Sequence, residues 1–340
     1  MAVGHSGSGT SARHSARKPV NRRPVVAAAA AAVAVLLAAL LLTRFLSSGG
    51  HKSGPGAGAG PVAAAAGGSR SPSTAVSSRP ESSPSSPISS SPPAHRDPFG
   101  AGAQSYLSGR AGTVLAAVYD LRTGQTWTLG QGSPEAEASI VKVDILETLL
   151  AEHHAAGTAL SARDMSLAVA MIEDSDNSAA TALWDTVGGA RGVRTYNAAV
   201  GLADTTPSRC VDCPGFPWPG WGLTTTTPAD QLALLREIAQ PNGQLSDSQR
   251  AYALGLMENV TQSQRWGVSG GVPSGVTVAL KNGWLPLTSA ADDWQINSIG
   301  WISGDGRSYL AAVLSTGNPS EQYGIDTINA LAAIVWRRMS

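Results

Sequence analysis

An uninterrupted run of apolar residues near the start of the chain constrains its organisation more than any other feature. The run covers residues 25–42, from Val25 to Leu42, and five basic residues precede it: Arg13, Arg17, Lys18, Arg22 and Arg23. At 1.5 Å per residue, a helix of this length spans roughly 27 Å, close to the hydrocarbon thickness of a bilayer. Basic flanking residues favour the cytoplasmic side of a membrane. We therefore expect a cytoplasmic segment at 1–24, a transmembrane signal anchor at 25–46 and a single-pass protein of the cell membrane.

A cleaved signal peptide is the alternative for this segment, and the remainder would then be secreted. The apolar region of a signal peptide usually has about 7 to 15 residues and ends in small residues at a cleavage site. This run is longer and is followed by Thr43, Arg44 and Phe45. We favour the uncleaved anchor, and in both cases the C-terminal region lies outside the cytoplasm.

Composition separates a linker from a folded region. Of the 54 residues at 47–100, 41 are Ser, Gly, Pro or Ala, a composition that predicts disorder because it cannot offset the entropy of folding. Only Phe45 and Phe99, of eighteen aromatic residues, precede residue 101. Residues 101–340 carry fourteen Lys or Arg against twenty-two acids, so this acidic region has no basic surface suited to nucleic acid.

The region 101–340 alternates between strand and helix patterns in a way that predicts one α+β domain. Strands are expected at 112–120, 125–129, 276–280, 295–302 and 309–315, and helices at 139–154, 163–173, 177–187, 227–239 and 325–337. Strands at both ends of the region with helices between them favour a single antiparallel sheet flanked by helices.

Three short motifs carry candidate chemistry. In the first, Ser139 and Lys142 are one turn apart at the start of a predicted helix, where backbone N–H groups and the helix dipole could stabilise an oxyanion. The second is Ser175-Asp176-Asn177, between two helical patterns, and the third begins at Lys281 after a strand. Each has an ordinary structural explanation on its own: an N-cap serine, a capping turn and an Asn-Gly hairpin turn.

Taken together and in this order, the motifs resemble those of the class A β-lactamases and the wider serine penicillin-recognising family, Ser-x-x-Lys, Ser-Asp-Asn and Lys-Thr-Gly. The resemblance extends over nearly all of 101–340 and implies a β-lactamase/transpeptidase-like fold. It also implies that Ser139 is the acylated nucleophile, that Lys142 helps to activate it and that Ser175 passes a proton to the leaving nitrogen.

The resemblance assigns the remaining motif residues to substrate binding. Asn177 would hold the substrate amide and Lys281 would attract its carboxylate. Gly283 would let the strand backbone approach the site closely, since glycine has no Cβ. The N–H groups of Ser139 and Trp284 would form the oxyanion hole.

The sequence departs from the family pattern at positions that matter for turnover. The family's deacylating base is a Glu in the loop after Ser-Asp-Asn, but residues 204–221 contain no Glu, and Asp212 is the acidic residue at about the right distance. Asn282 replaces the Thr of the third motif, where an amide would donate to the substrate in place of a hydroxyl, and Trp284 adds a bulky ring at the lip of the site.

Cys210 and Cys213 have the spacing of a redox motif or a zinc knuckle. Because the chain has no other cysteines and His153 and His154 are the only histidines after residue 100, we expect no metal site and no cofactor. Outside the cytoplasm a disulfide between Cys210 and Cys213 is favoured.

The leading hypothesis is an extracytoplasmic serine hydrolase that is acylated at Ser139 by a β-lactam or a related cell-wall amide or ester. It would act as a monomer, with activity like that of a β-lactamase or a D-alanyl peptidase and a possible part in β-lactam breakdown and antibiotic resistance. The alternatives are a catalytically degenerate member that binds peptidoglycan or a partner, and a redox protein that uses Cys210 and Cys213.

Overall fold

The computed structural model describes residues 96–288 and 292–339. In chain order the principal elements are α2 (Gly100–Leu107), β1 (Thr113–Asp120), β2 (Thr126–Leu129), β3 (Glu135–Ala136), η2 (Ala138–Ile140), α3 (Val141–Ala156), α4 (Ala162–Glu173), α5 (Asn177–Thr186), α6 (Gly189–Val200), η3 (Gly220–Leu223), β4 (Thr225–Thr226), α7 (Pro228–Ala239), α8 (Asp247–Glu258), η4 (Gln262–Gln264), β5 (Thr277–Pro286), β6 (Trp294–Gly304), β7 (Arg307–Asn318) and α9 (Glu321–Arg338).

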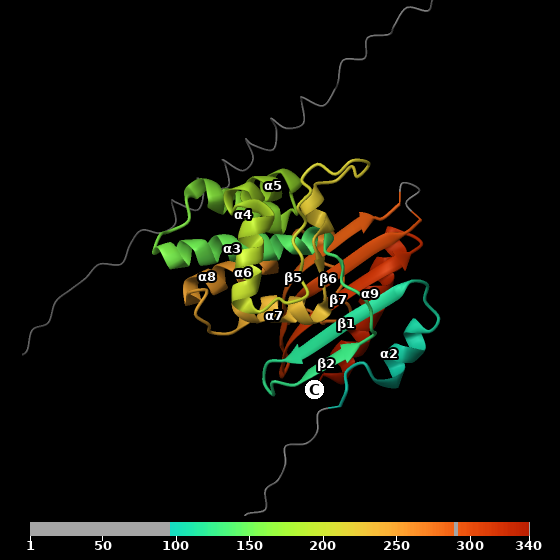
Figure 1. Cartoon of the computed structure of the whole chain (residues 1–340). Coiled ribbons are helices and arrows are strands. Elements are labelled where there is room, and N and C mark those ends of the chain that lie inside the picture. Colours follow the sequence, from blue (N-terminus) through green and yellow to red (C-terminus); the bar gives the residue numbers. More distant parts are fainter. Residues whose placement is uncertain (1–95, 289–291, 340) are drawn as a thin grey trace, which may run out of the picture. The chain divides into compact units, whose positions relative to one another are not determined.

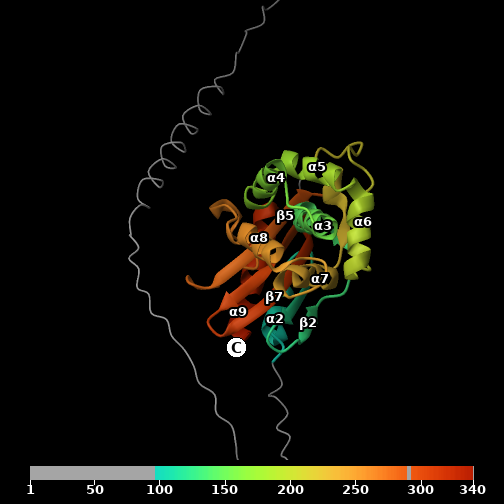
Figure 2. The same ribbon diagram turned by 90° about the vertical axis from the view of Figure 1, so that its left-hand side faces the viewer.

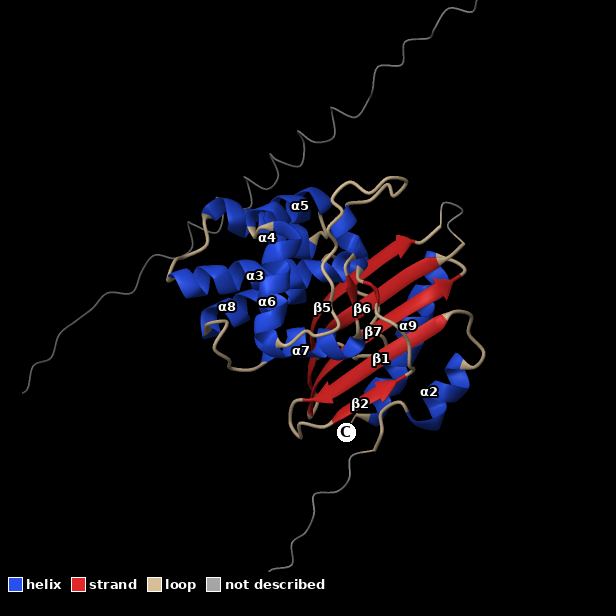
Figure 3. Cartoon of the chain, in the orientation of Figure 1, coloured by secondary structure: helices blue, strands red, loops and turns tan. Residues whose placement is uncertain are grey.

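The framework is a five-stranded antiparallel sheet with the strand order β2-β1-β7-β6-β5. Helices α3 to α8 lie on one side of this sheet, while α2 and α9 lie on the other (Figures 1 and 3). The view in Figure 2 shows the same separation from the side. The α+β fold with one antiparallel sheet flanked by helices, predicted from the sequence, is confirmed.

Alternation along the strands divides the apolar residues between two cores. In β1, Leu115 and Ala117 belong to the core shared with α3 to α8, while Ala116 and Val118 belong to the core beneath α9. Successive side chains of a strand point to opposite faces of its sheet, so each central strand contributes to both cores. In β5 the same rule places Ala279 in the first core.

The strand that carries the third motif is longer than expected. Strand β5 does not end at residue 280 but continues through Lys281, Asn282 and Gly283, with Asn282 paired to Ser298 of β6. The Asn-Gly pair therefore forms no turn, because pairing with β6 on one side decides its conformation. Helices α2, α6 and α8 were not predicted.

The boundary of the folded region lies slightly before residue 101. Phe99, within the range expected to be linker, is buried in the second core, and α2 begins at Gly100. In the part of the chain that the structure describes, no helix has the length and apolar character required to cross a membrane. The predicted anchor at 25–46 and most of the predicted linker at 47–100 lie outside these residues.

Candidate active site

Ser139 lies in η2, the tight turn that leads into α3, where the helical region meets the sheet. Ala138, directly before it, has a φ of +50°, which is uncommon for a residue with a side chain and typical of strained segments at functional sites. The Asn297 side chain on β6 holds this turn, since its Nδ2 donates to the carbonyl oxygens of Ala136 (2.8 Å) and Glu137 (2.9 Å). The sequence motifs gave no sign of this role for Asn297.

Gly283 on β5 lies directly against the turn that carries Ser139. A Cβ atom placed on Gly283 would be 2.6 Å from the Ser139 backbone nitrogen and 2.7 Å from the Glu137 carbonyl oxygen. These distances are shorter than any side chain tolerates, so glycine is required for this approach. The sequence interpretation expected close approach by Gly283, and the structure places it at the backbone of Ser139.

Lys142 and Lys281 meet at the hydroxyl of Ser175. Lys142 Nζ lies 3.0 Å from Ser175 Oγ, and Lys281 Nζ lies 2.9 Å from the same atom. Lys142 also donates to the Ser175 carbonyl oxygen (2.6 Å) and to Asn177 Oδ1 (2.8 Å). Ser175 has a φ of +56°, in the left-handed region, which is a second strained residue at this site. The three motifs are therefore brought together in space.

Burial controls the charge of both lysines. It lowers the pKa of Lys142 to about 7, although the nearby Asp176 carboxylate acts in the opposite direction. Burial also lowers the pKa of Lys281, and the nearby charge of Lys142 lowers it further. When Lys142 is neutral, its two N–H groups suffice for Ser175 O and Asn177 Oδ1, and its lone pair can accept the Ser175 hydroxyl proton.

Ser139 opens into a small cleft between η2, α5, β5 and the loop before η3. Its lining is mostly apolar and consists of Ala138, Ser139, Asn177, Phe216, Trp218, Pro219, Trp221, Gly222, Trp284 and Leu285. Trp221 is buried, and its ring centroid lies 5.1 Å from Lys142 Nζ. Its indole N–H donates to Thr181 Oγ1 at 3.0 Å. Trp221 therefore forms a wall beside the lysine.

The Asn282 side chain, which was expected to donate to the substrate, points away from the cleft. Asn282 is buried, and its Nδ2 donates to the carbonyl oxygens of Gln264 (2.6 Å) and Trp266 (3.1 Å). It lies on the sheet face opposite Lys281 because neighbouring strand residues alternate. The Trp284 ring packs against Trp266, with ring centroids 5.9 Å apart. Trp284 is partly buried and is also among the residues that line the cleft.

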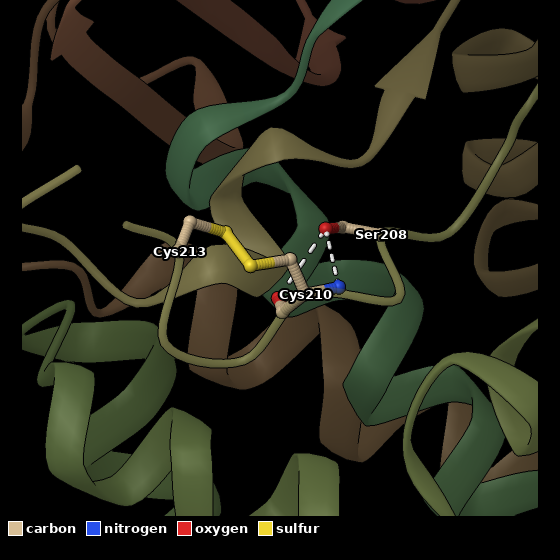
Figure 4. Close-up of a disulfide and its surroundings, with 3 residues drawn as sticks. All are labelled: Ser208, Cys210 and Cys213. Carbon is tan, nitrogen blue, oxygen red and sulfur yellow. Dashed lines mark hydrogen bonds between the residues drawn. A yellow bond between two sulfur atoms is a disulfide. The ribbon is translucent and has the colours of Figure 1, made fainter. Parts of the chain in front are cut away.

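The loop that carries the cleft wall contains a disulfide between Cys210 and Cys213, whose Cα atoms lie 5.5 Å apart (Figure 4). The Ser208 hydroxyl accepts from the Cys210 amide at 3.3 Å and lies 3.4 Å from the Cys210 carbonyl oxygen. Asp212, between the two cysteines, is exposed and is not among the residues that line the cleft. The structure therefore does not bring Asp212 to Ser139, Lys142 and Ser175.

A group of buried acids behind the site was missed by sequence reasoning. Glu137, Asp144 and Glu147 are buried, and burial raises the pKa of each, to about 7 for Asp144. Tyr196 donates to Glu147 Oε2 (2.7 Å), and Asn197 donates to Asp144 Oδ2 (2.9 Å). Among the described residues, neither Glu137 carboxylate oxygen has a hydrogen-bond partner. Burial therefore disfavours the charged form of each of these acids.

The acids do not form a metal centre. Within residues 96–288 and 292–339, no group of three or more His, Cys, Asp or Glu side chains is arranged to hold a metal ion. The chemistry available at the site is that of a serine hydroxyl with two low-pKa lysines and a second serine.

Known proteins that resemble this chain in sequence or in structure share this fold. Residues 150–339 match the model of the family described as "Beta-lactamase enzyme family". The TLA-1 extended-spectrum β-lactamase has a TM-score of 0.63 at 19% identity, over 70% of this chain and 96% of that one. A class A β-lactamase from Mycobacterium abscessus has a TM-score of 0.57 at 22% identity, over 69% and 96%.

A curated relative comes from Mycobacterium tuberculosis and is named "Putative lipoprotein LppW". It is 28% identical over 212 residues, which are 60% of this chain and 63% of that protein's length. The family match covers more than half of the 340 residues and includes the second and third motifs, while Ser139 and Lys142 precede it. The fold and the resemblance predicted from the motifs are confirmed, and the chain belongs to the beta-lactamase enzyme family.

Proposed function

We propose that this protein is a serine acyl hydrolase that forms an acyl-enzyme at Ser139 with a β-lactam or a related amide or ester. The observation that carries the proposal is the shared contact of Lys142 and Lys281 with Ser175, next to a turn at which Gly283 meets the Ser139 backbone. A lysine with a pKa of about 7 is in part neutral at physiological pH and can act as a base.

In the proposed acylation, Ser139 Oγ attacks the substrate carbonyl carbon while neutral Lys142 accepts the hydroxyl proton. The N–H groups of Ser139 and Trp284 stabilise the resulting oxyanion. The carbon–nitrogen bond then breaks, and the proton passes from Lys142 through the Ser175 hydroxyl to the leaving nitrogen. Asn177 holds the substrate amide, and Lys281, which contacts the Ser175 hydroxyl, binds the substrate carboxylate.

We further propose that the acyl-enzyme is long-lived. Its hydrolysis needs a general base that activates water. No Asp or Glu is among the described residues that line the cleft, and the indole of Trp221 lies beside Lys142. An apolar ring at this position offers water no proton acceptor, so deacylation is slow.

The proposed location is outside the cytoplasm and associated with the membrane. The predicted anchor at 25–46 supports it, as does the lipoprotein name of the mycobacterial relative.

The test is intact-mass measurement of the full-length protein after incubation with benzylpenicillin, beside the Ser139→Ala variant and with a chromogenic cephalosporin to follow turnover. We expect an adduct that persists for minutes and is absent from Ser139→Ala. Rapid colour without an adduct would contradict slow deacylation, and neither adduct nor colour would contradict acylation by β-lactams.

A second candidate is binding of peptidoglycan or a partner without catalysis. The orientation of Asn282 favours it, because this side chain is committed to the loop at Gln264 and does not reach the cleft. In that case the protein would sediment with purified peptidoglycan equally well with and without the Ser139 hydroxyl.

A further inference from the structure

A chain of side-chain hydrogen bonds on β6 leads to the turn that carries Ser139. Gln295 and Asn297 are two residues apart on this strand, which places their side chains on the same face of the sheet. Gln295 Nε2 donates to Glu135 Oε2 on β3 and to Asn297 Oδ1, at 2.7 Å in each case. Asn297 Nδ2 donates in turn to the backbone carbonyl oxygens at residues 136 and 137. The chain therefore starts and ends on the segment that enters the turn.

The two ends of this chain fix its direction. Backbone carbonyl oxygens can only accept, so Asn297 must turn its NH2 group toward them and its oxygen toward Gln295. An ionised carboxylate can also only accept, so Glu135 requires the NH2 group of Gln295, whose second hydrogen then serves Asn297. Rotating either amide by half a turn would bring oxygen against oxygen. Each amide therefore has one orientation that satisfies all its partners.

Burial makes these orientations matter. Gln295 and Asn297 are buried, and Glu135 is half-buried. Burial raises the pKa of Glu135, whereas the hydrogen bond from Gln295 lowers it, so this bond favours the ionised carboxylate. A buried amide that loses one partner is left with an unsatisfied group, which favours rearrangement of the next amide along. A change at Glu135 is therefore felt at Asn297.

The segment held by this chain sets the position of the Ser139 amide. Asn297 binds the Glu137 carbonyl oxygen from β6, and the Glu137 N–H donates at 2.7 Å to the carbonyl oxygen of Thr224, directly before β4. Ala138, next in the chain, has the φ of +50° that precedes the nucleophile. An uncommon backbone conformation persists only while its surroundings enforce it. The direction of the Ser139 N–H therefore depends on these supports.

We propose that Glu135 is a positioning residue for acylation, which aligns the Ser139 N–H with the substrate oxyanion through the two buried amides of β6. Glu135 is not among the described residues that line the cleft, so it influences the reaction through the chain rather than by contact. The inference rests on the proposed function, because the N–H is aligned for attack by Ser139. Breaking the chain should slow acylation by about tenfold, since a misaligned oxyanion donor costs less than the roughly 100-fold or more of a missing one.

The test follows adduct formation in the full-length protein by intact mass over a range of benzylpenicillin concentrations, which separates the acylation rate constant from the affinity of the noncovalent complex. We expect Glu135→Ala to lower the rate constant about tenfold and to change the affinity less than about twofold. Glu135→Gln should stay within about threefold of the wild-type rate constant, because its amide oxygen accepts from Gln295. Glu321→Ala is the matched control, since Glu321 is a half-buried acid of α9, on the opposite side of the sheet (Figure 1).

A double-mutant cycle distinguishes action through Asn297 from a separate effect of Glu135. The chain is already broken in Asn297→Ala, so adding Glu135→Ala should slow acylation no further, whereas independent effects would multiply. If Asn297→Ala does not fold, the two Glu135 variants decide the question alone. An unchanged rate constant in Glu135→Ala, an equal loss in Glu135→Gln, or multiplied effects in the double variant would overturn the proposal.

The proposed function is judged separately by the mass of the wild-type adduct. If the wild type forms no adduct, the acyl-enzyme is refuted, and the chain is tested by the ¹⁵N–¹H resonance of the Ser139 amide in the full-length protein. Glu135→Ala should shift this resonance, and Glu135→Gln should leave it close to its wild-type position. The same resonance position in all three proteins would refute the positioning role alone.

Discussion

Replacing Gly283 with alanine should displace the nucleophile, and the structure allows the size of the effect to be worked out. The new Cβ would be 2.6 Å from Ser139 N, 2.7 Å from Glu137 O and 2.9 Å from Ile140 N. All three neighbours are backbone atoms, so no side chain can rotate away. Restoring an ordinary contact of about 3.4 Å moves the strand and the η2 turn apart by about 0.8 Å at the closest pair.

This displacement has two measurable consequences. Overpacking of this kind costs about 1–3 kcal/mol of the free energy of unfolding. A shift approaching 1 Å in a reacting group slows a reaction by about 100-fold. We therefore expect Gly283→Ala to unfold at lower urea concentration and to form the benzylpenicillin adduct about 100 times more slowly.

Gly255→Ala is the matched control, since Gly255 lies inside α8 and a Cβ there has no neighbour within 4 Å among the described residues. It should stabilise the protein by about 0.5–1 kcal/mol and leave acylation unchanged. Wild-type acylation and stability in Gly283→Ala would refute the close approach of β5 to the Ser139 turn.

Three further predictions concern the titration of Lys142, the titration of Asp144 and the hydrogen bonds that hold the turn at Ser139. Acylation should increase with pH around a midpoint near 7, because neutral Lys142 is the base, and a pH-independent rate from 5 to 9 would argue against this. The contribution of Asp144 to the free energy of unfolding should fall by about 2 kcal/mol from pH 5 to pH 7, because a pKa of about 7 keeps it largely protonated in the folded state until pH approaches 7, while the unfolded chain has lost that proton above pH 4. Urea titrations of the wild type and Asp144→Asn at pH 5 and 7 isolate this contribution, and the same pH dependence in both proteins would contradict it. Asn297→Ala should cost about 1–3 kcal/mol and slow acylation, whereas Asn259→Ala, which removes an exposed bond to Gly255 O, should do neither.

Helices and strands whose apolar residues recur at regular spacing could be predicted from the sequence, whereas those that depend on tertiary contacts could not. The β1–β2 hairpin and α7, which has Thr227 as its N-cap and proline next, lie within a residue of expectation. Helix α6 was missed because Gly189 and Gly192 suggest a break. The structure explains Gly192, since a Cβ there would lie 1.6 Å from the Val187 carbonyl oxygen. The Ser246–Gln249 capping box before α8 was a readable signal that was overlooked.

Only those residues of the site that belong to the three sequence motifs could be predicted. The order and spacing of the motifs predicted four site residues: Ser139, Lys142, Ser175 and Lys281. In the structure, the amines of Lys142 and Lys281 both contact the Ser175 hydroxyl. The acids of α3 gave no such signal. Residues 141–150 are all buried, so Asp144 and Glu147 lie in a helix without a solvent face, where sequence periodicity suggests a surface position for charges.

The lack of a carboxylate in the cleft links the two halves of the proposed reaction. A carboxylate beside Lys142 would stabilise its ammonium form and raise its pKa, which would remove the neutral amine that accepts the Ser139 proton. Trp221 occupies the space beside Lys142, and burial disfavours the charged forms of the acids behind the site. The lysine pKa of about 7 follows from this environment. The same apolar wall that favours a neutral lysine, and so acylation, supplies no carboxylate to activate a hydrolytic water, and so retards release of the acyl group.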